Sequence, residues 1–254
     1  MIHILILLSC PLILISADHN IMDHGAVGDG ITLNTIAIQT TIDLAHKEGT
    51  GRVIIPEGRF LTGSITLRSG VELHLEEGAV LLGSTIFEHH KKVEKSYMRA
   101  IIMASYQNDI AITGKGCIDG QGRATAIRTD SLFHSGALDM KYYNTIEGRP
   151  RFYMRPMLVV FLGCKKVLVS DVTMKNAASW VQHYDRCSDL TIRGIRVDSD
   201  AYWNNDGIDI SDSKHVHVSN CKINAADDGI CLKSHFDDEI LENVVIEHLS
   251  LIHI

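Results

Sequence analysis

A short repeat in the second half of the chain constrains the fold more than any other feature. One hydrophobic pattern recurs with its first aliphatic residue at Val167, Leu190, Val216 and Val244, which are 23, 26 and 28 residues apart. A repeat of this length leaves no room for a crossover helix between parallel strands, so the chain must climb by winding. We therefore predict an all-β protein, a parallel β-helix with three short strands and three turns in each coil.

This winding fixes where equivalent side chains lie. Equivalent residues of neighbouring coils are about 4.8 Å apart, the spacing between strands in a sheet. Inward positions then stack as ladders of Val, Ile and Leu, and outward positions on one face form a long flat cleft. Runs of aliphatic residues bounded by turn residues predict further strands at 52–56, 64–67, 71–75, 79–82 and 110–113.

Two segments depart from the strand pattern. Thr35–His46 has the apolar spacing of a helix, with Ile36, Ile38 and Ile42 on its apolar side, and we expect it to cap the open end of the first coil. The segment Gly120–Arg155, rich in Arg, Tyr and Gly, interrupts the rhythm and is expected to form loops beside the cleft.

Composition restricts the class of partner. With 254 residues, 45% of them apolar and 22% charged, the chain can bury one sizeable core. The formal net charge of −7 argues against a general binder of nucleic acid or of anionic membranes. We expect a monomer.

The first residues resemble an export signal. The apolar run Ile4–Ile15 is too short to span a bilayer and is followed by Ser16-Ala17-Asp18. This predicts a secretory signal peptide at 1–17, a mature β-helix domain at 18–254, and a secreted or periplasmic protein. Lipoprotein processing at Cys10 is one alternative. A buried first strand is another, which Pro11 disfavours.

The remaining cysteines do not form a recognisable metal or redox motif. Their number is odd and no CxxC pair occurs, so we expect buried thiols and neither a zinc nor a redox site. The 14 histidines also lack HxxxH or HExxH spacing, and neither a metal nor another cofactor is predicted.

An acidic group recurs at coil spacing. The segment Asn204–Ile210 aligns with Ala226–Leu232 through a shared D-G-I pattern, 22 residues apart. Asp228 should therefore stack beside Asp206, with Asp227 next to them. Crowded carboxylates repel, and this raises the pKa of at least one of them. A protonated carboxyl group beside ionised ones is what acid/base cleavage of a glycosidic bond requires.

These acids could instead have one of two non-catalytic roles. Asp-Gly steps commonly cap strands as Asx turns, which is a purely structural role. The alternative of a calcium site rests on the oxygen donors of Asp198, Asp200, Asp206 and Asp209, although no known calcium-loop spacing is present.

The same residues resemble a known family. Asn204-Asn205-Asp206-Gly207 is similar to the N-[TN]-D-G motif, and Asp227–Ser234 is similar to the D-D-x-[IV]-x-[LI]-K-S motif, of the polygalacturonases in family 28 of the glycoside hydrolases. The segments Gly25–Asn34, Gly51–Gly58 and Asn176–His183 add to the resemblance, which extends from about residue 20 to residue 245.

The resemblance implies a right-handed parallel β-helix and inverting hydrolysis of α-linked galacturonosyl residues in pectin, without a cofactor. Carried over by position, Asp227 would be the general acid, and Asp206 and Asp228 would together activate the attacking water. Lys233, His183 and Asn204 are assigned to substrate binding: the lysine would meet a uronate carboxylate, and the histidine would line the cleft beside Trp180.

The sequence departs from the family near its end. The Gly-His-Gly and Arg-x-Lys motifs that the family uses are not found after Asp228, and His248 and His253 lack flanking glycines. We therefore expect the domain to be incomplete at its carboxyl end, with an exposed final coil that favours aggregation. The competing functions are a calcium-dependent pectate lyase and a non-catalytic carbohydrate-binding β-helix.

Overall fold

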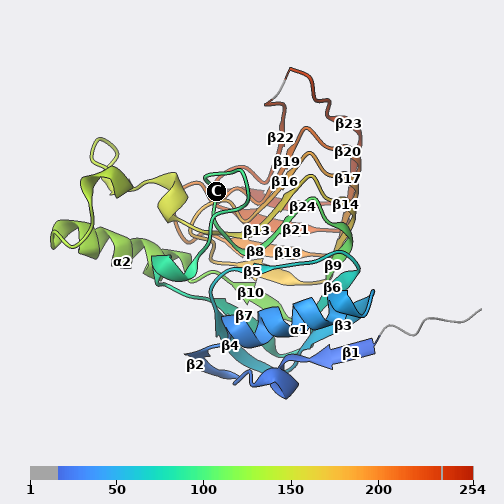
Figure 1. The fold of residues 1–254 in the computed structure, drawn as a ribbon. Helices are drawn as coiled ribbons and strands as arrows, with labels where there is room; N and C mark the ends of the chain where they lie inside the picture. Colours follow the sequence, from blue (N-terminus) through green and yellow to red (C-terminus); the bar gives the residue numbers. More distant parts are fainter. Residues whose placement is uncertain (1–16, 236, 254) are drawn as a thin grey trace, which may run out of the picture.

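The computed structural model describes residues 17–235 and 237–253, which form one parallel β-helix (Figure 1). The predicted signal peptide at 1–17 and the alternative lipidation site at Cys10 fall almost wholly outside the described residues. Ala17 is already part of the first strand, which pairs with the strand that begins at Gly51.

Three parallel sheets form the walls of the coil, and consecutive strands of each sheet, in the order given, are hydrogen-bonded. Sheet A contains β1 (Ala17–Asn20), β3 (Gly51–Ile55), β6 (Val71–Leu75), β9 (Asn108–Gly114), β14 (Lys165–Ser170), β17 (Ser188–Arg193), β20 (Lys214–Ser219) and β23 (Glu242–Glu247). Sheet B contains β2 (Asp29–Leu33), β4 (Gly58–Thr62), β7 (Ala79–Gly83), β10 (Cys117–Asp119), β15 (Thr173–Lys175), β18 (Arg196–Ser199), β21 (Lys222–Ala225) and β24 (Ser250–His253). Sheet C contains β5 (Ile65–Thr66), β8 (Ala100–Ser105), β13 (Met157–Leu162), β16 (Gln182–Asp185), β19 (Ile208–Ser211) and β22 (Ile230–Lys233).

The repeat found in the sequence is the register of sheet A. Val167 pairs with Leu190, Leu190 with Val216, and Val216 with Val244, so the predicted ladder is confirmed. The first three of these side chains are at most 2% exposed and belong to the continuous core inside the coil. The five strands predicted in the first half are also present, within two residues at each end.

A backbone feature accompanies each step of this ladder. The residue directly before each ladder position has a left-handed conformation: Lys166, Asp189, His215 and Asn243 have φ between 52° and 54°. The pairing skips these residues, since Lys165 pairs with Ser188 and Val167 with Leu190. Asn, Asp and His tolerate this conformation better than most residues, which accounts for Asp189, His215 and Asn243 but not for Lys166.

The predicted capping helix is present. Helix α1 (Thr35–Lys47) contacts β3, β5 and β6 and covers the first coils (Figure 1). Ile38, Ile42 and Ala45 are fully buried under it, and burial of each isoleucine contributes about 1.5–3 kcal/mol. Ile36 is an exception to the expected apolar face, because it is 82% exposed at the start of the helix. A 3-10 helix, η1 (Ile21–His24), packs against α1.

The prediction of loops for Gly120–Arg155 is wrong in part. The segment contains helix α2 (Gly122–His134), the 3-10 helices η3 (Met140–Tyr142) and η4 (Phe152–Met154), and a hairpin of β11 (Tyr143–Asn144) and β12 (Arg149–Pro150). The side of α2 that faces the protein is made of Gly122, Thr125, Ala126 and Thr129 rather than large apolar residues, so it lacks the hydrophobic period that identifies helices.

Three smaller features complete the fold. All five cysteines of the described part are free, and Cys164, Cys187 and Cys221 are buried as expected. None of the helices in residues 17–235 and 237–253 is long and apolar enough to cross a membrane. The remaining 3-10 helix, η2 (Phe87–His89), lies between sheet B and sheet C in the chain.

Candidate active site

The turns before β19 and β22 bring two of the predicted carboxylates together. Ile208 pairs with Ile230, and Asp206 and Asp228 each lie two residues before these positions. The backbone N–H of Gly207 donates to the carbonyl oxygen of Asp228 at 2.8 Å, which fixes one turn on the other. The stacking predicted from the 22-residue spacing is therefore present.

Gly207 is required for this close approach. A Cβ atom at this position would lie 2.6 Å from the carbonyl oxygen of Gly229 and 2.6 Å from Cγ2 of Ile223. Such distances are far below van der Waals contact. Only glycine therefore allows the two acid-bearing turns to stack at this spacing.

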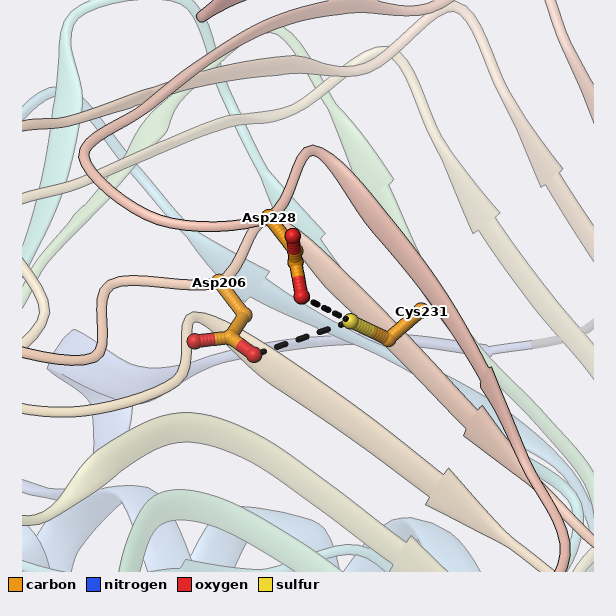
Figure 2. A group of neighbouring side chains, drawn as sticks. All are labelled: Asp206, Asp228 and Cys231. Atoms are coloured by element: carbon orange, nitrogen blue, oxygen red, sulfur yellow. Dashed lines mark hydrogen bonds between the residues drawn. The ribbon is translucent and has the colours of Figure 1, made fainter. Parts of the chain in front are cut away.

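A thiol lies between the two carboxylates. An oxygen of Asp206, an oxygen of Asp228 and Sγ of Cys231 are all within 4.8 Å of one another (Figure 2). Cys231 Sγ donates to Oδ2 of Asp228 at 3.0 Å and lies 3.7 Å from Oδ2 of Asp206. Burial and the hydrogen bond to Asp228 both raise the pKa of this thiol, so it stays protonated and acts as a donor.

Asp206 is the buried member of the acidic group. It is 5% exposed, and within the described residues its Oδ1 has no hydrogen-bond partner. Burial raises the pKa of Asp206, and the charges of Asp227 and Asp228 raise it further, whereas Lys233 lowers it. The sequence predicted crowding as the cause, but loss of solvent is the larger effect.

Asp227 is half-buried at the start of the same turn as Asp228. Its Oδ1 accepts a hydrogen bond from the backbone N–H of Asp228 at 3.1 Å. Its charge acts on Asp206, so the three acids share one electrostatic environment. The catalytic roles assigned to them stay predictions.

Asn205 builds the turn that carries Asp206. It is fully buried, and its Oδ1 accepts from Ser199 Oγ and from the backbone N–H groups of Ala201 and Tyr202, at 2.9–3.1 Å. Its Nδ2 donates to the carbonyl oxygens of Ala177 and Ser179. The second residue of the Asn-Asn-Asp-Gly motif is therefore a structural support for the acid that follows it.

Lys233 contacts two acids rather than open solvent. Its Nζ lies 3.7 Å from Oδ2 of Asp206, forms an ion pair with Asp209, and sits 3.7 Å from the centre of the Trp180 ring. Burial lowers the pKa of Lys233, but the hydrogen bond and charge of Asp209 outweigh it and the pKa is raised. A substrate carboxylate would have to share this lysine with Asp209.

Asp209 is a residue whose importance sequence reasoning missed, because it was considered only as a calcium donor. It is fully buried, and burial raises the pKa of its carboxyl to about 7 against the opposing effect of Lys233. It pairs across sheet C with His183 on one side and Cys231 on the other. The signal was available: Asp209 occupies the variable position of the D-G-I-x pattern, aligned with Cys231.

His183 lies beneath the cleft surface. Its side chain is fully buried, Nε2 is 2.9 Å from Oγ of Ser211, and its ring meets Trp180 edge-on at 5.3 Å between centroids. Burial lowers the pKa of His183 to about 3, with Lys233 and His235 acting in the same direction, so the ring is neutral. This position favours support of Trp180 over direct contact with a sugar.

Asn204 has a left-handed backbone, with φ of 58°, and lies beside two arginines. Its Oδ1 accepts from Nη1 of Arg149 at 3.1 Å and from Nη2 of Arg155 at 3.0 Å. The sequence assigned this residue to substrate binding and expected the Arg-rich segment Gly120–Arg155 beside the cleft. It did not indicate that two arginines of that segment bind Asn204.

Two cavities share the Trp180 side chain. One, of about 270 Å³, is lined by His183, Asp185 and His235 among others. The other, of about 380 Å³, is lined by Arg149, Arg155 and Asn204 among others. Neither lining includes Asp206, Asp227 or Asp228. The cavities are connected to these acids through Asn204, two residues before Asp206, and through Lys233, which contacts both Trp180 and Asp206.

The donors present do not suit calcium. Asp198 interacts with Arg196 and Asn224, and Asp209 is paired with Lys233, so neither carboxylate is available. In the described part of the chain the cluster of potential ligands is Asp206, Asp228 and Cys231, and a protonated thiol is a poor ligand for an ion that takes six to eight oxygens.

The chain is similar to known proteins over most of its length. The profile of "Glycosyl hydrolases family 28" matches residues 46–251. The Vitis vinifera protein "Probable polygalacturonase" is 31% identical over 236 residues, which is 86% of this chain and 45% of that protein. The exo-poly-alpha-D-galacturonosidase of Dickeya chrysanthemi is 29% identical over 249 residues, covering 83% of this chain and 41% of that protein.

The structural likeness is equally extensive. The hyperthermoactive exopolygalacturonase of Thermotoga maritima superposes with a TM-score of 0.79 at 26% identity, covering 93% of this chain and 60% of that one. The expected right-handed parallel β-helix is thereby confirmed. The chain spans about half the length of these two polygalacturonase relatives.

Proposed function

Because this chain belongs to glycosyl hydrolases family 28, we propose that it hydrolyses α-glycosidic bonds of galacturonate-containing pectin by acid/base catalysis with inversion. The observation that carries the proposal is the stacking of Asp206 and Asp228, within 4.8 Å of each other through one pair of oxygens, beside Asp227. Repulsion between these acids costs stability, which a purely structural turn would avoid by using asparagine.

The roles follow from the environment of each acid. Asp227, half-buried and reachable from solvent, protonates the leaving glycosidic oxygen. Asp206 and Asp228 take the proton of the attacking water. The raised pKa of Asp206 makes it the stronger base once it is ionised. Inverting enzymes hold acid and base about 6.5–9.5 Å apart so that water fits between them.

Substitution of Asp227 tests this mechanism. Asp227→Asn should lower the release of reducing ends from polygalacturonate on the order of 10²–10⁴-fold, because the substrate loses its proton donor. The assay should use both the 254-residue chain and the longest open reading frame that contains it. Asp189→Asn is the matched control, since Asp189 is exposed on sheet A in a conformation that asparagine tolerates.

Three results would contradict the proposal. Equal activity of the parent and Asp227→Asn would exclude Asp227 as the acid. An unsaturated product detected by ultraviolet absorbance, with loss of activity on chelation, would indicate a lyase. Binding of oligogalacturonate without any product after prolonged incubation would indicate a non-catalytic protein.

We also propose that the chain is exported to the periplasm or the medium and acts there as a monomer. The apolar run Ile4–Ile15 followed by Ser16-Ala17 supports export. Mass spectrometry of the protein expressed from its native start should find Asp18 as the first residue, whereas a lipid on Cys10 would identify a lipoprotein. Retention of Met1 would contradict export. Elution as a dimer in size-exclusion chromatography would contradict the monomer.

A further inference from the structure

A basic cavity beside the acids has no role in the hydrolytic steps described above. We define the arginine pocket as the cavity of about 380 Å³ whose lining includes Arg149, Arg151, Arg155, Phe152, Trp180 and Asn204. We propose that the arginine pocket binds the carboxylate of a uronic acid residue of the substrate chain. This inference rests on the proposed function, because it assigns a further part of the substrate to the same cleft.

Arg155 is a buried cation without an acidic partner. It is 3% exposed, and no carboxylate of the described residues lies within ion-pair distance of it. Its Nη1 donates to the carbonyl oxygen of Trp203 at 2.7 Å and its Nη2 to Oδ1 of Asn204 at 3.0 Å, while Nε has no partner. Burial lowers the pKa of Arg155 to about 10. The more distant charge of Glu147 and the rings of Phe152 and Tyr202, each 5.6 Å from Cζ, offset part of the cost of burying this cation.

Arg149 brings a second guanidinium to the same place. Its Nη1 donates to the Asn204 oxygen that also accepts from Arg155, and its own charge partner is Glu147, with Nε to Oε2 at 2.6 Å. Arg151 adds a third positive charge, so three arginines and one glutamate line the pocket. The excess of positive charge attracts an anion, and the planar guanidinium matches the geometry of a carboxylate or a phosphate group.

The position of the pocket connects it to the reacting bond. Trp180 lines both the arginine pocket and the cavity that includes His183. Lys233 lies over the Trp180 ring and 3.7 Å from Asp206. Asn204 is only two residues before Asp206. A sugar that packs on Trp180 next to the acids would therefore have its neighbour's carboxylate within reach of the arginines.

The ligand class follows from these charges. A neutral sugar would leave the excess positive charge of the pocket unbalanced, because one glutamate faces three arginines. A nucleic acid or a phosphorylated partner would meet a protein whose formal net charge is −7. A uronic acid polymer carries one carboxylate on each sugar residue, and a single local basic pocket can bind one of these carboxylates.

Calorimetric titration with trigalacturonate and with its fully methyl-esterified form tests the inference. The titrations use Asp227→Asn, in which the ligand is not consumed, alone and combined with Arg149→Gln. We expect the acid to bind about tenfold more tightly than the ester, and Arg149→Gln to remove this preference. Arg151 is exposed, and Arg151→Gln should weaken the binding of trigalacturonate severalfold. It gives a second variant if Arg149→Gln unfolds. Arg123→Gln is the matched control in the same segment, exposed and outside the pocket, and should change nothing.

Equal affinity for acid and ester, or unchanged binding in both arginine variants, would overturn the inference. The hydrolysis of polygalacturonate by the parent chain is measured separately. If the parent hydrolyses polygalacturonate and both arginine variants bind as the parent does, the hydrolase function stands and the carboxylate-binding role of the pocket is wrong. If Arg149→Gln loses the preference for the acid but the parent shows no hydrolysis, the carboxylate-binding role stands and the hydrolase function is wrong.

Discussion

Two rows of side chains on sheet C share one backbone and differ in chemistry. The inner file consists of Phe161, Tyr184 and Ile210, which pair across β13, β16 and β19 and lie in the core. The outer file consists of Val160, His183, Asp209 and Cys231, one residue earlier on the same strands and on β22. The side chains of the inner file must fit the packing of the core. The side chains of the outer file differ in polarity and charge from one coil to the next.

Burial alone does not distinguish the two files. His183 and Asp209 are as fully buried as Phe161 and Ile210. What differs is the cost: burial raises the pKa of Asp209 to about 7 and lowers that of His183 to about 3, so both groups are pushed towards their neutral forms. This protein therefore accepts the electrostatic cost of buried ionisable groups on one side of a sheet whose other side is ordinary apolar core.

Truncation of the inner file should have the largest effect on stability and little on catalysis. Phe161→Ala should lower the free energy of unfolding by about 3–5 kcal/mol, because it leaves a cavity against Tyr184, whose ring lies 5.8 Å away. Urea denaturation measures the loss. The kcat of the folded variant on polygalacturonate should stay within about threefold of the parent.

Ile146→Ala, at a position that is 96% exposed, provides the control and should change stability by less than about 0.5 kcal/mol. A fall in kcat of more than about tenfold in a folded Phe161→Ala protein would show that the two files are not independent.

Substitution in the outer file should change how stability depends on pH. The folded pKa of Asp209, about 7, is above the unfolded value of 3.8, so between these values the folded protein holds a proton that the unfolded chain has lost. The stabilisation from this group is present at low pH and is lost as the pH rises through about 7. Relative to Asp209→Asn, the parent should therefore lose up to about 1.4 kcal/mol per pH unit over this range.

Urea denaturation of both proteins at several pH values between 4.5 and 7.5 gives the difference. The histidines of the two proteins are the same, so the opposite pH dependence expected from His183 cancels. The difference in stability between the parent and the control Asp189→Asn should not change with pH. A difference between the parent and Asp209→Asn that is independent of pH would mean that Asp209 is ionised throughout.

The last member of the outer file should have the smallest effect. Cys231→Ala removes the thiol that donates to Asp228 at 3.0 Å and should lower kcat by about tenfold or less, with about 1 kcal/mol lost in stability. Cys117→Ala, a half-buried thiol on sheet B, is the matched control and should leave kcat unchanged. Equal kcat values for Cys231→Ala and the parent would confine the role of this thiol to packing.

The sequence predicted what depends on periodicity and missed what depends on contacts between distant segments. The register of Val167 with Leu190 and the stacking of Asp206 on Asp228 follow from spacing alone, and both were predicted. The arginines beside Asn204 come from an insertion with no fixed spacing to the acids. Helix α2 was missed because small and polar residues make up its buried side. The importance of Asp209 was missed because it depends on a contact with Lys233, which lies on the next coil.

The alternation of side chains along β13, β16 and β19 has a consequence for how such proteins diversify. A mutation at an outward position replaces a reactive group without altering the apolar contact on the opposite side of the strand. Homologous β-helix proteins can therefore acquire new substrate preferences by single substitutions at outward positions, while the hydrophobic interior stays the same.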